Sequence, residues 1–167
     1  MTDYQRLYHA WTAPFRRYPK LVVILRLVNK SLTYLMYQVY PLFLLHIYLK
    51  DGWRSQLLAL LLVPAASFLL VSLFRRLYNQ PRPYETWDLA PLIIRTSKGK
   101  SMPSRHVFSA TLISMCVLVS YPHFGACLLF LSLLLAICRV LGGVHYPKDV
   151  LIGYMLGIAS GALLCLA

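Results

Sequence analysis

The chain has 167 residues, of which 59% are hydrophobic and only 13% are charged. A soluble domain of this length usually carries about 25% charged residues, so the composition argues against a soluble protein and predicts one membrane domain. The net charge of +12 predicts an anionic partner, which in this apolar setting is lipid or phosphate and not nucleic acid.

The N-terminal segment, residues 1–30, mixes aromatic and aliphatic side chains with many arginines and lysines. This mixture predicts an amphipathic helix that lies in the membrane interface, where its basic residues meet an anionic lipid bilayer. The apolar run from Leu21 to Val28 is short and contains Arg26, so a sixth transmembrane span there stays an alternative. The N-terminal segment has no clean apolar run followed by a small-residue cleavage site, so we expect no cleavable signal peptide.

Five later segments are apolar and close to the length that crosses a bilayer, which is about 20 residues. They are residues 31–49, 56–74, 106–121, 126–141 and 149–167. Ser104 is a suitable residue to begin the third span, and Pro147 opens the last one after Gly142-Gly143 ends the fourth. The predicted fold is an all-α integral membrane protein, a bundle of five transmembrane helices in a single domain over residues 31–167, or six if the N-terminal segment also crosses.

The last predicted span carries three glycines at intervals of four residues, Gly153, Gly157 and Gly161. Small residues at this spacing let two helices approach closely. We expect them to serve packing within this chain, with a homodimer as the alternative.

Three polar clusters stand out from the apolar background: Arg75-x6-Arg82-Pro83, Pro103-Ser104-Arg105-His106 and Arg139-x5-His145-x3-Asp149. The number of spans between them places all three on the same side of the membrane. One span more or fewer would have separated them, so the sequence predicts a single site.

The side chains of these clusters fit phosphate chemistry. An imidazole beside a carboxylate four residues away, His145 and Asp149, is suited to nucleophilic attack. His106 can protonate a leaving oxygen. Cations and helix-start donors suit the phosphate oxygens, and the candidates are Arg75, Arg82, Ser104, Arg105 and Arg139.

Each residue alone has an ordinary structural explanation. A basic residue at the end of a span is usually an interfacial anchor, and a single histidine there is usually structural. His9, His46 and His123 keep that interpretation. The order and common location of the three clusters favour the functional interpretation for the others.

These motifs resemble the type-2 phosphatidic acid phosphatase family, which shares its site with bacterial acid phosphatases and vanadium haloperoxidases. The family pattern is K-x6-R-P, then P-S-G-H, then S-R-x5-H-x3-D. The resemblance extends from Arg75 to Asp149. Three positions depart from the pattern: Arg75 replaces lysine, Arg105 replaces glycine and Cys138 replaces serine.

The resemblance implies that His145 forms a phosphohistidine, with Asp149 as its partner and His106 as the general acid. It implies no metal and no other cofactor. The expected function is metal-independent hydrolysis of a membrane lipid phosphate or diphosphate, with undecaprenyl pyrophosphate first and phosphatidylglycerophosphate, phosphatidic acid or a lipid A phosphate as alternatives. A non-enzymatic protein that binds or transports anionic head groups is the second hypothesis.

Two arguments give opposite orientations for the site. The excess of Lys and Arg on the side of the site would place that side in the cytoplasm by the positive-inside rule. The family resemblance implies a site at the outer face of the cell membrane. We take the outer face as the prediction, because several of these basic residues belong to the site.

Overall fold

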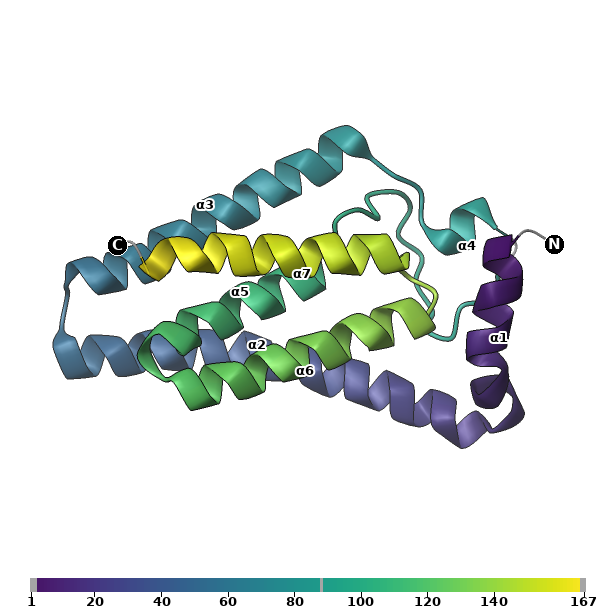
Figure 1. Cartoon of the computed structure of the whole chain (residues 1–167), viewed down its shortest axis with the longest axis horizontal. Coiled ribbons are helices and arrows are strands. Elements are labelled where there is room, and N and C mark those ends of the chain that lie inside the picture. Colours follow the sequence, from purple (N-terminus) through teal and green to yellow (C-terminus); the bar gives the residue numbers. More distant parts are fainter. Residues whose placement is uncertain (1–2, 88, 166–167) are drawn as a thin grey trace.

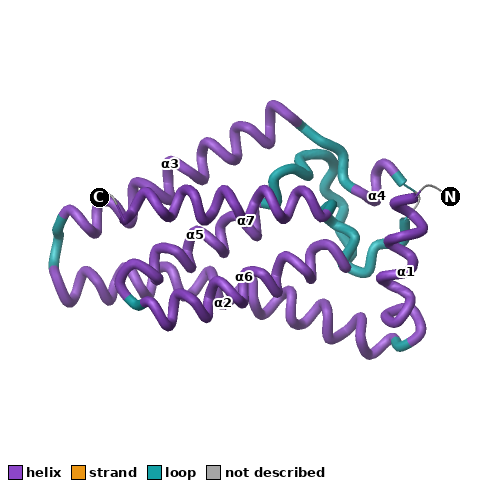
Figure 2. Tube along the Cα trace, viewed as in Figure 1, coloured by secondary structure: helices purple, strands orange, loops and turns teal. Residues whose placement is uncertain are grey.

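The computed structural model describes residues 3–87 and 89–165, and the secondary structure in these ranges is helical. Helix α1, Asp3–Arg17, lies across one end of a bundle made by the longer helices (Figure 1). Figure 2 shows that the longest loop region lies at this same end. This end carries the C-termini of α3 and α6 and the N-termini of α5 and α7. We call it the site end, because the three polar clusters of the sequence lie at these helix ends.

The helices follow the prolines and glycines of the sequence. Four helices begin with proline, whose fixed backbone angle suits the first helical position: α2 at Pro19–Asp51, α4 at Pro83–Thr86, α6 at Pro122–Leu141 and α7 at Pro147–Ala162. Helix α3, Ser55–Tyr78, ends where Asn79 takes a left-handed conformation. Helix α5 is Arg105–Ser120, and the short helix η1, Leu163–Cys165, follows α7.

Four helices, α2, α3, α6 and α7, are long and apolar enough to cross a membrane. Helix α5 has 16 residues, or about 24 Å, and ten of them are buried. It can be shorter than a usual span because it lies inside the bundle, against α6 and α7. The prediction of a bundle of five transmembrane helices is confirmed, and the protein is a multi-pass membrane protein.

The N-terminal segment is divided differently from the prediction. An amphipathic helix is present, but it ends at Arg17, and Tyr18 separates it from α2. Residues 19–30 continue the first span, so the boundary predicted at residue 30 is not a helix boundary. Helix α1 has 15 residues, which is too short to be a sixth span.

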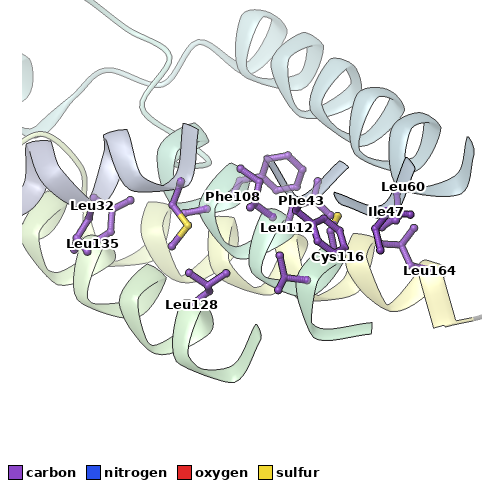
Figure 3. Packing of buried hydrophobic residues seen from close by; sticks show 14 of the residues in the cluster. Leu32, Phe43, Ile47, Leu60, Phe108, Leu112, Cys116, Leu128, Leu135 and Leu164 are labelled. Carbon is purple, nitrogen blue, oxygen red and sulfur yellow. The ribbon is translucent and has the colours of Figure 1, made fainter. Parts of the chain in front are cut away.

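The core and the surface of the bundle are both apolar. Figure 3 shows Phe43 from α2, Leu60 from α3 and Phe108 from α5 among the buried side chains of one apolar cluster between the helices. Many leucines point outward instead, and Leu70 is 68% exposed. Because such a surface is stable in lipid and not in water, the packing agrees with a membrane location.

The glycines of α7 pack inside the protein. A Cβ atom on Gly153 would lie 2.8 Å from the carbonyl oxygen of Ser104, and one on Gly157 would lie 2.7 Å from the Cβ of Thr111. All three glycines are buried, so α7 approaches α5 closely along its length. This face is therefore occupied within the chain, and a homodimer would have to use another surface.

Candidate active site

The central feature of the site end is a buried histidine–carboxylate pair. His145 lies in the loop between α6 and α7, and Asp149 lies in the first turn of α7, as the Pro147 helix start predicts. The His145 Nδ1 lies 3.6 Å from the Asp149 Oδ2, and both side chains are almost fully buried. Because Nδ1 faces the carboxylate, Nε2 on the opposite side of the ring is the atom that remains for chemistry.

Three donors hold the Asp149 carboxylate in place. The Ser101 hydroxyl donates to Oδ2, and this hydroxyl also lies 3.4 Å from the His145 Nδ1. The Tyr146 backbone N–H donates to the same Oδ2 at 3.1 Å, and the Gln80 amide donates to Oδ1 at 3.3 Å. A buried carboxylate with this many donors stays ionised.

The surroundings keep His145 neutral. Burial lowers the pKa of His145 well below its usual value, and Asp149 opposes this effect only in part. The nearby charges of Arg139 and Arg82 act in the same direction as burial. A neutral imidazole has the free lone pair that a nucleophile needs.

The second histidine pairs with an arginine. The guanidinium of Arg139, at the end of α6, donates to the His106 Nδ1 at 2.9 Å and to the Asn29 amide oxygen at 3.3 Å. Since a guanidinium only donates, Nδ1 of His106 accepts, and the ring in this arrangement is neutral with its proton on Nε2. The Arg139 side chain is buried, and its Nε has no partner among the described residues.

The other two buried arginines bind the loop backbone. The Arg75 guanidinium donates to the carbonyl oxygens of Lys100, Ser101 and Pro103. Arg82 donates to the carbonyl oxygens of Gly99 and Val144, both at 3.1 Å. The loop before α5 thus contacts both arginines, and Arg82 also joins it to the loop that carries His145.

The two remaining predicted residues lie side by side in sequence but differ in exposure. Ser104 is fully buried, and its backbone N–H donates to the carbonyl oxygen of Asp149 at 2.8 Å. It precedes α5 as predicted, yet its hydroxyl makes no capping bond and has no partner among the described residues. Arg105 is exposed, and its guanidinium lies over the ring of Phe68 at 5.4 Å.

The site end opens toward a cavity of about 130 Å³ between α2, α3 and α5, with Arg105 and His106 on its wall. A second cavity, of about 390 Å³, shares Tyr37 and Phe68 with the first and is almost entirely apolar. Figure 1 shows that α2 and α3 diverge toward the site end from their connection at the opposite end. The two cavities occupy the space between the diverging helices.

The structure brings the predicted residues to one end of the bundle and adds several that the sequence reasoning missed. The additional residues are Asn29, Gln80, Glu85, Arg95 and Ser101. Glu85 and Ser101 lie close to the motifs in sequence, which was the available signal. Asn29 comes from α2, more than a hundred positions from its partner Arg139, and no sequence spacing connects the two.

The fold and the site define a multi-pass membrane protein with a buried centre of two histidines, one carboxylate and several guanidinium groups. The chain belongs to the PAP2 superfamily, whose family model matches residues 56–167. The resemblance drawn from the three motifs is therefore confirmed.

Two curated relatives are similar to this chain. Undecaprenyl-diphosphatase BcrC of Bacillus subtilis (strain 168) is 31% identical over 126 residues, which cover 74% of this chain and 65% of the relative. Bacitracin transport permease protein BcrC of Bacillus licheniformis is 30% identical over 84 residues, which cover 50% of this chain and 41% of the relative. The matches thus span less than two thirds of the length of these relatives.

Two solved structures share the fold. LpxE of Aquifex aeolicus has a TM-score of 0.75 at 24% identity, with 98% of this chain and 94% of that chain covered. The first transmembrane PAP2 type phosphatidylglycerolphosphate phosphatase from Bacillus subtilis has a TM-score of 0.73 at 22% identity, with 99% of this chain and 86% of that chain covered. The fold of almost the whole chain therefore has counterparts among solved structures, one of which is described as transmembrane.

Proposed function

We propose that this protein is an integral membrane lipid phosphatase that removes a phosphate from a lipid phosphate or diphosphate through a phosphohistidine intermediate. The observation that carries the proposal is the buried His145–Asp149 pair, surrounded by His106 and buried guanidinium groups. Binding a head group alone would need the cations but neither histidine.

In the first step, the His145 Nε2 attacks phosphorus while Asp149 stabilises the positive charge that develops on the ring. The P–O bond to the leaving group breaks, and its electron pair goes to the leaving oxygen. That oxygen takes a proton from His106. In the second step, water attacks the phosphohistidine, gives its proton to His106 and releases inorganic phosphate.

The contact between Arg139 and His106 bears on this proton transfer. The neutral His106 of the present arrangement is the form that acts as a base in the second step. The first step needs a second proton on the ring. A bound phosphate dianion favours that proton by Coulomb attraction and competes with the ring for the Arg139 donors.

Phosphate binding is assigned to Arg75, Arg82, Ser104 and Arg139. The Ser104 hydroxyl and the Arg139 Nε support this assignment, because both are buried polar groups without a partner among the described residues. Buried polar groups are normally hydrogen-bonded, and a bound phosphate would supply the missing partner. The N-terminus of α5, which follows Ser104, adds backbone donors and a favourable dipole.

The apolar space between α2, α3 and α5 supports a lipid as the substrate. It runs from the cavity beside His106 toward Tyr40 and Pro64 within the membrane-spanning part of the bundle. A lipid tail can lie there while the head group reaches the histidines. Undecaprenyl pyrophosphate is the leading candidate because a relative carries the name undecaprenyl-diphosphatase, and phosphatidylglycerophosphate, phosphatidic acid and a lipid A phosphate follow.

The proposed location is the cell membrane, with the site at the outer face.

The experiment that tests the enzyme proposal is phosphate release by purified protein from a panel of lipid phosphates. We expect His145→Gln to abolish release, while His123→Gln, an exposed histidine elsewhere on the bundle, retains it. Unchanged release by a folded His145→Gln protein would refute the mechanism.

The second candidate function is non-enzymatic binding or transport of anionic head groups. It is supported by the similarity to a relative named a bacitracin transport permease protein. The same assay separates the two candidates, because this function predicts head-group binding without phosphate release by the wild-type protein.

A further inference from the structure

Arg95 lies in the loop between α4 and α5, outside all three motifs of the sequence. It is half-buried, and no hydrogen bond or ion pair engages its guanidinium among the described residues. Its charge nevertheless acts on four groups of the site, namely Arg75, Arg82, His106 and Arg139. A cation that lies near like charges and is not ion-paired with a carboxylate is a natural binding point for an anion.

The backbone on both sides of Arg95 is fixed. Before it, the Ile93 N–H donates to the carbonyl oxygen of Gly142 at 3.1 Å. After it, the Tyr84 hydroxyl donates to the carbonyl oxygen of Ser97. Because the loop is held at both positions, the guanidinium is presented to a ligand with little loss of backbone freedom.

Four residues after Arg95, the same loop contacts Arg82, one of the buried arginines. The Gly99 N–H donates to the Glu85 carboxylate at 2.8 Å, and the Gly99 carbonyl oxygen accepts from the Arg82 Nε at 3.1 Å. Arg95, Glu85 and Gly99 line one surface depression of about 590 Å³, together with Lys98. This depression therefore adjoins the proposed phosphate site.

Arg105 is the second cation with free donors at the edge of the site. Its guanidinium lies over the ring of Phe68 and makes no hydrogen bond or ion pair among the described residues, so its N–H groups are available. Its charge, like that of Arg95, acts on both Arg75 and His106. In contrast, the donors of Arg75 and Arg82 are largely used by backbone carbonyl groups.

The charges around the site exceed those of a single phosphate. Five guanidinium groups are opposed by two carboxylates, Asp149 and Glu85, which leaves a surplus of at least three positive charges, to which Lys98 adds; the five are Arg75, Arg82, Arg95, Arg105 and Arg139. A terminal phosphate carries roughly −2 near neutral pH, and a diphosphate adds about one further negative charge. The surplus matches a diphosphate better than a monophosphate.

We propose that Arg95 and Arg105 form a second anion site, which holds the inner, lipid-linked phosphate of a diphosphate while the buried arginines hold the terminal phosphate. This inference rests on the proposed phosphatase function and specifies its substrate class. The His145 Nε2 bonds to the terminal phosphorus, and the bond from that phosphorus to the bridging oxygen breaks. The electron pair stays on the bridging oxygen, which leaves as part of the lipid monophosphate, and the two arginines stabilise its charge. Water then releases inorganic phosphate from His145.

The test compares two substrates with the same tail, farnesyl diphosphate and farnesyl phosphate, on the purified full-length protein. For Arg95→Gln with Arg105→Gln, we expect kcat/KM for the diphosphate to fall roughly 10- to 100-fold, as for the loss of charge-assisted hydrogen bonds. For the monophosphate we expect a change of less than about threefold, because the lost contacts are absent there. Arg76→Gln, an exposed arginine next to Arg75, is the matched control and should leave both values unchanged.

The inference and the proposed function fail in different ways. No phosphate release by the wild-type protein from either substrate contradicts the phosphatase function. Release from the monophosphate alone, or equal losses on both substrates in the double variant, overturns the second anion site. If the double variant does not fold, the test is inhibition of the wild-type and Arg95→Lys proteins by inorganic diphosphate and by inorganic phosphate. If diphosphate inhibits these proteins no more strongly than phosphate does, the second anion site is contradicted.

Discussion

At the scale of single residues, the site depends on charges that are buried with specific partners. Asp149 has three donors, and the buried arginines bind backbone carbonyl groups or a histidine. Burial of a charge is costly unless such partners are present, so the loops must fold around the cations before the site exists. His145 differs, because burial removes its charge.

The low pKa of His145 predicts a loss of stability in mild acid. The imidazole of the unfolded chain takes up a proton near pH 6.5, whereas burial prevents this in the folded protein. Stability is therefore full above pH 6.5 and falls as the pH decreases, by up to about 2 kcal/mol at pH 5. The measurement is the thermal midpoint in detergent at pH 7.5 and pH 5.

The variant His145→Gln cannot titrate at this position and should lose less stability over the same pH interval. The exposed His123→Gln variant should behave like the wild-type protein. Equal losses for all three proteins would contradict a buried, neutral His145.

At the scale of secondary-structure elements, the packing of α5 against α7 aligns the two helices that carry His106 and Asp149. The glycines of α7 remove the side chains that would separate the helices, and the bond from the Ser104 N–H to the Asp149 carbonyl oxygen joins their first turns. The site therefore depends on the closeness of two helices over their whole length.

Gly157→Leu should separate α5 from α7. A Cβ atom there would lie 2.7 Å from the Cβ of Thr111 and 2.9 Å from the carbonyl oxygen of Phe108, and both belong to a fully buried part of α5. We expect a loss of about 1–3 kcal/mol in stability and a reduced kcat. The matched control is Ala159→Leu on the exposed face of α7, and a thermal midpoint that falls as much for the control would contradict this role.

At the scale of the whole molecule, the bundle has two chemically different ends. The site end carries the site, α1 and nearly all the basic residues, while the connection between α2 and α3 at the opposite end carries Lys50 and Arg54. Several of the arginines at the site end bind groups of the protein itself and are unavailable as cytoplasmic anchors. This supports the proposal of an outward site against the positive-inside rule.

Cysteine labelling of intact cells tests the orientation. Ser97→Cys, in the exposed loop of the site end, should react with a membrane-impermeant thiol reagent, whereas Ser55→Cys at the opposite end should react only after lysis. The exposed Cys127 and Cys165 are replaced by alanine beforehand. Labelling in the reverse order would place the site in the cytoplasm.

Much of the architecture could be predicted from the sequence. The spans follow from the length and hydropathy of apolar segments, and the end of the fourth span and the start of the last follow from Gly142-Gly143 and Pro147, because these residues act locally on the backbone. The division of the N-terminal segment at Tyr18 was missed. A basic, aromatic segment has the same composition whether it extends a span or lies in the interface.

By itself, the sequence determined the class of the protein, the number of spans and the common side of its three motifs, since these depend on composition and on the order of the chain. Only the tertiary structure decided which donors each charge uses. It joined Arg139 to His106, Ser101 to Asp149 and Arg82 to the backbone around His145. It also placed Arg95, a residue outside every motif, beside the proposed site. These relations depend on contacts between elements far apart in sequence, and no local pattern encodes them.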